Sequence, residues 1–222
     1  MSVAPKKIAV VLAGCGVFDG SEIHEAVCTL LNLAANGADY QCFAPDAPQP
    51  AVIDHRRKTP AVGERRNMLT EAARIARGNI KSLNEFKPED FDAVIFPGGQ
   101  GAAKNLCNFA LRGAAAEVRP DVKKALTDAY GAGLPIGAIC IAPALVALAL
   151  GHHGITLTIG NDAATAAEIE KTGARHQVCE TEGVCVDEQH RIVSTPAYML
   201  ASSVAEVNAG IARLVKEILR MC

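Results

Sequence analysis

Cys140 is the residue of this sequence whose type and position point most directly to chemistry. It follows a short apolar run, 135–139, that predicts a buried strand of a parallel sheet, and it precedes an Ala- and Leu-rich segment, 142–150, that predicts a helix. A residue in such a strand-to-helix elbow projects from the carboxyl edge of the sheet, beside the N–H of Ile141. Because a helix N-terminus favours negative charge, we expect a lowered thiol pKa and a reactive thiolate. The alternative is a buried cysteine that serves as a small hydrophobic residue.

A glycine-rich turn supplies the second part of a possible site. The apolar run 92–96 predicts a buried strand, and Pro-Gly-Gly-Gln-Gly follows it at 97–101. Such a turn lets backbone N–H groups face an anion, but the order of residues in a nucleotide-binding phosphate loop is absent. We therefore expect the N–H groups of Gly99 and Ile141 to form an oxyanion hole for a carbonyl attacked by Cys140. Two weaker candidates for substrate binding are Gly98 and Asn105.

A carboxyl group is the third part. Glu22 lies in the first turn of the first predicted helix, where a carboxylate is stabilised by the helix N-terminus even without any function. The functional interpretation is that Glu22 meets Cys140 at the carboxyl edge of the sheet, where open α/β folds bind ligands. His24 and Glu25 are rivals for this role, and Glu22 ranks first.

These residues need a sheet and helices to position them. Residues 6–12 and 40–43 predict strands, and Ser21 is the expected N-cap of the helix between them. The predicted buried face of that helix consists of apolar residues at helical spacing: Ile23, Ala26, Val27, Leu30, Leu31 and Ala34.

The rest of the chain continues the alternation of strands and helices. A Pro-rich, partly irregular insertion is expected around 44–87. Further helices are predicted at 66–75, 120–130, 163–172 and 201–219, a strand at 155–159 and an edge β-hairpin within 176–195. This pattern predicts a single α/β domain over 1–222, with a doubly wound, mostly parallel sheet and helices on both faces.

Composition narrows the classes of partner. The 222 residues carry a formal net charge of −2, so the charge gives no reason to expect binding to nucleic acid or an anionic membrane. No apolar run has the length of a membrane span, and eight scattered cysteines without a Cys-x-x-Cys pair are typical of reduced thiols. With no signal peptide expected, the predicted location is the cytoplasm and the predicted partner a small molecule.

With these motifs, the chain resembles the class I glutamine amidotransferase-like superfamily. That superfamily includes the Parkinsonism-linked deglycase/chaperone proteins and the PfpI-type proteases. The sequence is most similar to the ElbB-type (ES-one-like) branch, whose members are called isoprenoid-biosynthesis or glyoxalase proteins. The segments that carry this resemblance are 19–27, 42–46, 67–78, 98–106 and 194–201. The resemblance implies a flavodoxin-like fold and a homodimer.

Three departures from relatives of known type limit the possible activities. PfpI-type proteases have a histidine directly after the nucleophile, where this chain has Ile141, so proteolysis is not expected. Glutaminases need a His-x-Glu that His190 and its neighbours do not supply. Deglycase-type relatives place a histidine at the position of Gly160, whereas His152 and His153 are expected on the surface.

The resemblance then implies a slow glyoxalase that needs neither glutathione, nor another cofactor, nor a metal. Cys140 would add to glyoxal or methylglyoxal, and Glu22 would carry a proton between the two carbons to give a 2-hydroxy acid. For Glu22 to lie near a thiolate, its pKa would have to be raised. The alternatives are a redox-sensing protein with an oxidisable Cys140 and a binding protein that supports isoprenoid biosynthesis.

Overall fold

The fold is organised around a seven-stranded sheet in the order β10-β11-β7-β6-β1-β2-β5. The structure is a computed structural model, and it describes residues 4–222. All neighbouring strands pair in parallel except β10, which is antiparallel to β11 at one edge. The strands are β1 (Lys7–Val11), β2 (Asp39–Ala44), β5 (Ile80–Ser82), β6 (Ala93–Phe96), β7 (Ile136–Ile139), β10 (Cys185–Asp187) and β11 (Ile192–Thr195). The expected flavodoxin-like, mostly parallel α/β fold is confirmed.

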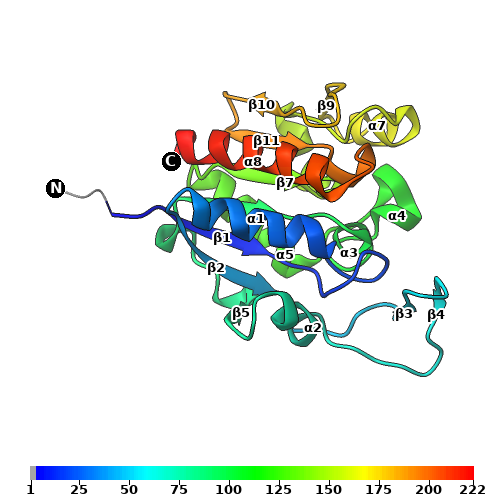
Figure 1. Cartoon of the computed structure of the whole chain (residues 1–222). Helices are drawn as coiled ribbons and strands as arrows, with labels where there is room; N and C mark the ends of the chain where they lie inside the picture. The colour runs from blue at the N-terminus through cyan, green and yellow to red at the C-terminus, as the bar shows by residue number, and fades with distance from the viewer. Residues whose placement is uncertain (1–3) are drawn as a thin grey trace.

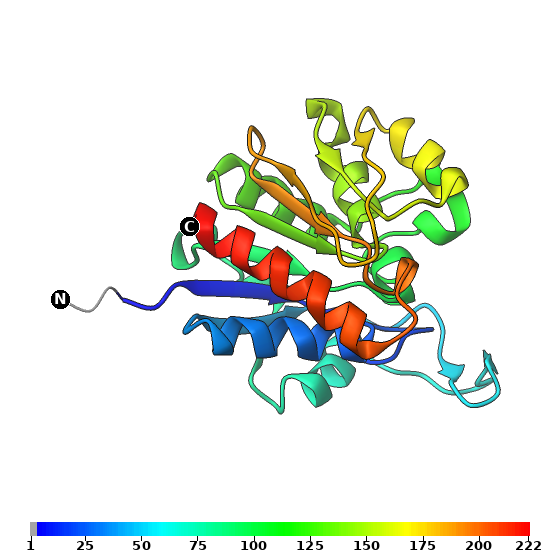
Figure 2. The same cartoon turned by 45° about the horizontal axis from the view of Figure 1, so that its top comes forward.

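Helices cover both faces of this sheet (Figures 1 and 2). On one face lie α1 (Ile23–Ala35), α2 (Met68–Ile75) and α8 (Val204–Met221), and Figure 2 shows α8 lying alongside α1. The other face is covered by α3 (Gln100–Lys104), α4 (Phe109–Arg112), α5 (Pro120–Gly131), α6 (Ala142–Leu150) and α7 (Ala163–Glu170).

The central strands are apolar throughout because both of their faces are buried. In β1, Ile8 and Val10 pack beneath α1 and α8, whereas Ala9 and Val11 face the opposite core, which contains residues of α5 and α6. All four side chains are fully buried. Successive side chains of a strand point to opposite faces, so a strand between two helical layers cannot alternate apolar and polar residues.

The parallel strands bring distant loops together at their carboxyl ends. The loops after β1, β6 and β7 lead directly into α1, α3 and α6. The two ends of the loop after β1 are joined, because the N–H of Ala13 donates to Ser21 Oγ (2.9 Å). It also contacts the turn after β6, where the N–H of Gly101 donates to the carbonyl of Gly20 (2.8 Å). This edge of the sheet is where the candidate site forms.

Two predictions about α1 are wrong. The N-cap is Glu22 rather than Ser21, whose hydroxyl is used within the preceding loop. The face predicted to be buried is partly in solvent, since Ile23, Val27 and Leu31 are exposed. The helix instead buries the face that carries Glu25, and this packing brings the carboxyl group of Glu25 to the site between α1 and the sheet. Apolar spacing alone does not reveal such a contact.

The predicted strand 155–159 is only partly present and lies outside the main sheet. Its central residues form β8 (Thr156–Leu157), which pairs in parallel with β9 (Arg175–His176). The edge hairpin is confirmed, but it comprises only β10 and β11.

The expected insertion is less irregular than predicted. It contains a small hairpin of β3 (Ile53–Asp54) and β4 (Thr59–Pro60), then α2, then β5 at the edge of the main sheet. Figure 1 shows the β3–β4 hairpin projecting from the body of the molecule.

Candidate active site

Cys140 lies in a sharp turn between β7 and α6. Its backbone has a φ of 62°, a left-handed conformation that is uncommon outside glycine. The N–H of Cys140 donates to the carbonyl of Thr195 (2.9 Å), which ties the turn to the end of β11. Pro143 is accepted because it stands in the first turn of α6. The expected strand-to-helix elbow is therefore present.

The glycine-rich turn after β6 packs directly against this elbow. A Cβ atom at Gly98 would lie 2.5 Å from Cys140 Cβ, so only glycine permits this approach. At the next residue, Gly99, φ is 91°. The N–H groups of Gly99 and Ile141 both lie near the sulfur of Cys140 and act to lower its pKa. The two groups predicted as an oxyanion hole thus converge on the same sulfur atom, and their catalytic role stays a prediction.

The carboxyl group that contacts Cys140 belongs to Glu25. Its side chain is fully buried and lies close enough to the thiol for each group to shift the pKa of the other. The N–H of Gly98 donates to Glu25 Oε2 (3.0 Å), and the N–H of Tyr198 donates to Oε1 (3.3 Å). Glu22 lies one turn earlier and caps α1, where its Oε2 accepts from the N–H of Glu25 (2.7 Å).

The sequence ranking of Glu22 above Glu25 therefore missed the residue that touches sulfur. Both glutamates lie near the start of one helix, and nothing in the sequence says which of them faces the elbow. The direction is set by the packing of α1 on the sheet. Glu22 nevertheless lines the cleft that opens in front of Cys140, so the site contains two carboxyl groups in different positions.

Burial controls the protonation of both reactive groups. It raises the pKa of Glu25 to about 8, an effect to which the charge of Glu22 adds and which hydrogen bonds from Cys140, Tyr198 and Gly98 oppose. Burial also raises the pKa of the Cys140 thiol well above its ordinary value, and the charge of Glu25 raises it further. The expected lowering of the thiol pKa is wrong, because these two effects outweigh the N–H donors at the start of α6. The resting thiol is therefore protonated, and it lies beside Glu25.

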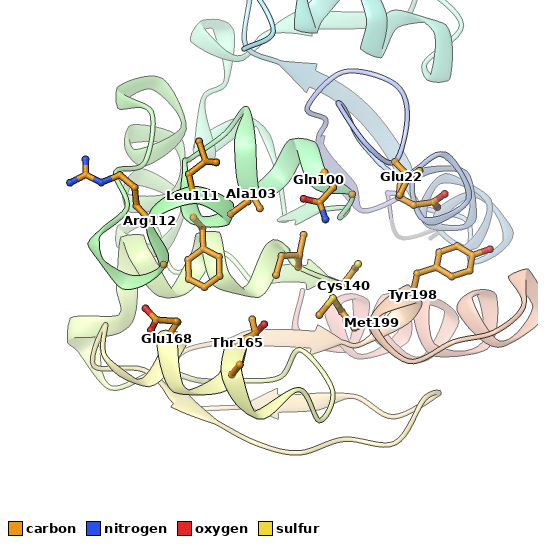
Figure 3. Close-up of a pocket in the computed structure, with 17 residues that line it drawn as sticks. Glu22, Gln100, Ala103, Leu111, Arg112, Cys140, Thr165, Glu168, Tyr198 and Met199 are labelled. Carbon is orange, nitrogen blue, oxygen red and sulfur yellow. The ribbon is translucent and has the colours of Figure 1, made fainter. Parts of the chain in front are cut away.

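A cleft of about 760 Å³ opens in front of the sulfur (Figure 3). Around Cys140 its walls include Glu22, Gly99, Ile141 and Tyr198. The cleft then runs between α3 and α4 on one side and α7 on the other. Figure 3 shows Gln100 and Met199 near the reactive end, with Thr165 and Glu168 further along.

The weaker predictions, Gly98 and Asn105, have structural roles. Neither is among the residues that line the cleft. Gly98 lies beneath the thiol, where it provides the close approach of two turns. Asn105 is buried, and its amide donates to the carbonyls of Ala13 (2.7 Å) and Asp19 (2.8 Å), which fixes the loop after β1. The assignment of Asn105 to substrate binding is therefore corrected.

The position that holds a histidine in deglycase-type relatives is closed to a side chain. Gly160 has a φ of 101°, and a Cβ atom there would lie 2.9 Å from Leu200 Cγ. His152 and His153 are exposed, as expected. Of the residues that the structure describes around the cleft, none is a histidine. The ionisable side chains around the sulfur are the carboxyl groups of Glu22 and Glu25 and the hydroxyl of Tyr198, which is hydrogen-bonded to Nδ1 of His24 (2.7 Å).

The described residues contain neither a cluster of metal-binding side chains nor a helix that could span a membrane. Over residues 4–222, the His, Cys, Asp and Glu side chains do not form a group of three or more that could hold a metal ion. Within the same range, no helix has both the length and the apolar character needed to cross a lipid bilayer.

Gly98→Ala should disrupt the site. The added methyl group would lie 2.6 Å from Glu25 Oε2 as well as against Cys140, so the two turns must separate. We expect a loss of about 1–3 kcal/mol in the free energy of unfolding, measured by urea denaturation. The control is Gly131→Ala at the end of α5, where no atom lies within 4 Å and the change should be neutral or slightly stabilising. Equal stability of the two variants would contradict the close approach.

Glu25→Gln should stabilise the protein more at high pH than at low pH. The pKa of Glu25 is about 8 in the folded protein and near 4.5 in the unfolded chain. Its contribution to the free energy of unfolding is therefore complete below pH 4.5 and is lost as the pH rises through about 8. Glutamine does not ionise. Relative to wild type, the variant should therefore gain roughly 2–4 kcal/mol between pH 5 and pH 8.5, as measured by urea denaturation at both values. The exposed substitution Glu89→Gln is the control, and a gain independent of pH would argue against a neutral buried Glu25.

Solved structures place the fold among known proteins. An isoprenoid biosynthesis protein with an amidotransferase-like domain from Ehrlichia chaffeensis is 39% identical, with a TM-score of 0.90 over 97% of this chain and 99% of that one. Glyoxalase III from Candida albicans superposes with a TM-score of 0.62 over 97% of each chain, but at 15% identity it shows the fold alone. No protein-family model matches the chain.

Sequence relatives give the family and correct one expectation. The human glutamine amidotransferase-like class 1 domain-containing protein 3, mitochondrial, is 44% identical over 97% of this chain and 83% of its own length. The mitochondrial ES1 protein homolog of Rattus norvegicus is 42% identical over 99% of this chain and 86% of its own. Since these relatives are named as mitochondrial, the expected cytoplasmic location is wrong. The chain belongs to the glutamine amidotransferase-like class 1 family that includes the ES1 proteins.

Proposed function

We propose that the protein is a glutathione-independent glyoxalase that converts glyoxal or methylglyoxal into a 2-hydroxy acid. The observation that carries the proposal is the thiol of Cys140, which lines an open cleft and lies beside the buried carboxyl group of Glu25. The fold shared with a glyoxalase III structure is compatible with it. The proposed reaction uses side chains, backbone N–H groups and water, and it needs no cofactor.

In the first step, the sulfur of Cys140 attacks the aldehyde carbon and its proton passes to Glu25. A carboxylate beside a protonated thiol can act as a general base at the moment of attack, so a preformed thiolate is not required. The carbonyl oxygen becomes an oxyanion, which the N–H groups of Gly99 and Ile141 stabilise. Glu25 then returns the proton to this oxygen, which gives a hemithioacetal.

The second step moves a hydrogen between the two substrate carbons. Glu22 lines the cleft beside Cys140, which supports its proposed role as the carboxyl group that acts on a bound substrate. It removes the proton from the carbon bonded to sulfur and returns it to the neighbouring carbon through an enediol, which leaves a thioester of the 2-hydroxy acid. Water then hydrolyses the thioester, releasing glycolate from glyoxal or lactate from methylglyoxal and restoring the thiol of Cys140.

The main alternative is a redox-sensing or binding protein with little turnover. Oxidation by peroxide needs a thiolate, and the raised pKa of Cys140 leaves little thiolate at neutral pH. A role in isoprenoid biosynthesis rests on the name of a solved relative. Burial of the thiol, which keeps it protonated, therefore favours the enzyme over the sensor.

Glyoxal consumption without glutathione tests the proposal directly. Cys140→Ala should abolish it, and Glu25→Gln and Glu22→Gln should each lower kcat by about 10²–10⁴-fold, the usual contribution of a general acid–base group. Because Glu25 must be ionised to accept the thiol proton, kcat/KM of the wild type should rise with pH and level off above about 8.

Turnover that survives Cys140→Ala would refute the proposal, as would an inactive wild type. Loss of activity in Glu25→Gln alone would assign both proton transfers to Glu25 and remove Glu22 from the mechanism. The exposed Glu89→Gln should match the wild type.

We also propose that the protein forms a homodimer through the outer face of α1. Ile23, Val27 and Leu31 are spaced by four residues and therefore share one helix face, and all three are exposed. A stripe of this kind can pack against the same stripe of a second copy across a two-fold axis. Light scattering after size exclusion should give a dimer for the wild type and a monomer for Val27→Lys. A monomeric wild type would contradict the proposal.

A further inference from the structure

The cleft is much larger than glyoxal or methylglyoxal requires. Its volume of about 760 Å³ falls in the range of roughly 300–1,000 Å³ that holds drug-sized ligands. The reacting groups occupy only one end of it. Figure 3 shows Cys140 and Glu22 at that end, with Ala103, Leu111 and Thr165 extending the walls away from the sulfur.

The walls beyond the reacting end are mainly apolar. Phe109 of α4 is 7% exposed and forms part of the cleft wall, while Leu111 on the same helix is 80% exposed at the cleft. Ala103, Ile141 and Met199 continue this surface toward Cys140. A large apolar side chain left in water beside a cleft gains free energy when an apolar ligand covers it.

The charged groups at the far end are already engaged with the protein. Glu168 accepts from the N–H of Ala114 (2.8 Å) and pairs with Lys171. Arg112 pairs with Glu117 (3.5 Å), and Figure 3 shows its side chain pointing away from the cleft. The one basic side chain among the described lining residues, Arg112, is therefore paired in solvent and directed away from the sulfur, which argues against a charged substituent on the substrate.

From these contacts we infer that the preferred substrate is a 2-oxoaldehyde that carries an uncharged aromatic or extended alkyl group. The inference rests on the proposed function. The aldehyde carbon bonds to Cys140, and the substituent on the neighbouring ketone lies over Phe109 and Leu111. The reaction proceeds as for the smaller substrates. The carbon bonded to sulfur loses a hydrogen and the ketone carbon gains it. Water then cleaves the thioester and releases an aryl- or alkyl-substituted 2-hydroxy acid.

The test compares phenylglyoxal with methylglyoxal, without glutathione. Burial of the phenyl group should raise kcat/KM by about tenfold, mainly through a lower KM, because this contact is made equally in the ground and transition states. Leu111→Ser should reduce the ratio of the two kcat/KM values by about three- to fivefold. Val62→Ser is the control, since Val62 is 96% exposed and does not line the cleft.

The outcomes separate this inference from the proposed function. Equal kcat/KM values for the two substrates would overturn the inference and leave the glyoxalase standing. If wild type turns over neither substrate, the proposed function fails, and calorimetric binding of mandelate and lactate still tests the cleft. Mandelate, the product from phenylglyoxal, should then bind about tenfold more tightly than lactate, and equal affinities would overturn the inference.

Discussion

The contact between the thiol of Cys140 and the carboxyl of Glu25 is the constraint on which the rest of the site depends. A buried carboxylate is costly unless it is neutralised or hydrogen-bonded. Here two backbone N–H groups, from Gly98 and Tyr198, bind its oxygens, and the pKa rises to about 8. The pair therefore holds its protons at neutral pH. A group that gives up its proton only near pH 8 is suited to receive one from a neighbouring thiol.

This contact is possible because three turns approach more closely than side chains would allow. Gly98 lies against Cys140, and a Cβ atom at Gly99 would be 2.3 Å from the backbone nitrogen of Glu22. Gly101 is similarly close to the backbone of Gly20. The loops after β1, β6 and β7 thus form one packed unit. The carboxyl groups, the N–H donors and the thiol are held by the backbone, so small changes in this packing alter their protonation as well as their positions.

The cleft extends from this packed unit of three loops to a mainly apolar surface. At one end, carboxyl groups and backbone N–H groups surround the sulfur. At the other, α4 and α7 contribute walls that are apolar or whose charges are already paired. In the proposed reaction, chemistry and substrate recognition thus belong to separate elements. On that proposal, substitutions in α4 and α7 change the preferred substituent without disturbing the elbow.

The sequence by itself determined the parts that depend on local pattern. Continuous apolar runs identified β1, β6 and β7 because strands buried on both faces have no polar positions. The elbow at Cys140 and the glycine turn at 98–99 followed from the same logic, since each is a strand, a turn and a helix in succession. Motif resemblance identified the family.

Tertiary structure alone decided which groups act on one another. Glu22 and Glu25 are equivalent in the sequence, and only the packing of α1 directs Glu25 at the thiol. The direction of the thiol pKa shift also depends on tertiary structure. The helix N-terminus after Cys140 can be predicted from the sequence, but burial and the neighbouring carboxyl group, which outweigh it, cannot. The exposed stripe on α1 and the cleft beside α4 and α7 have the same origin. They depend on which segments meet in space, and the spacing of residues along the chain does not contain that information.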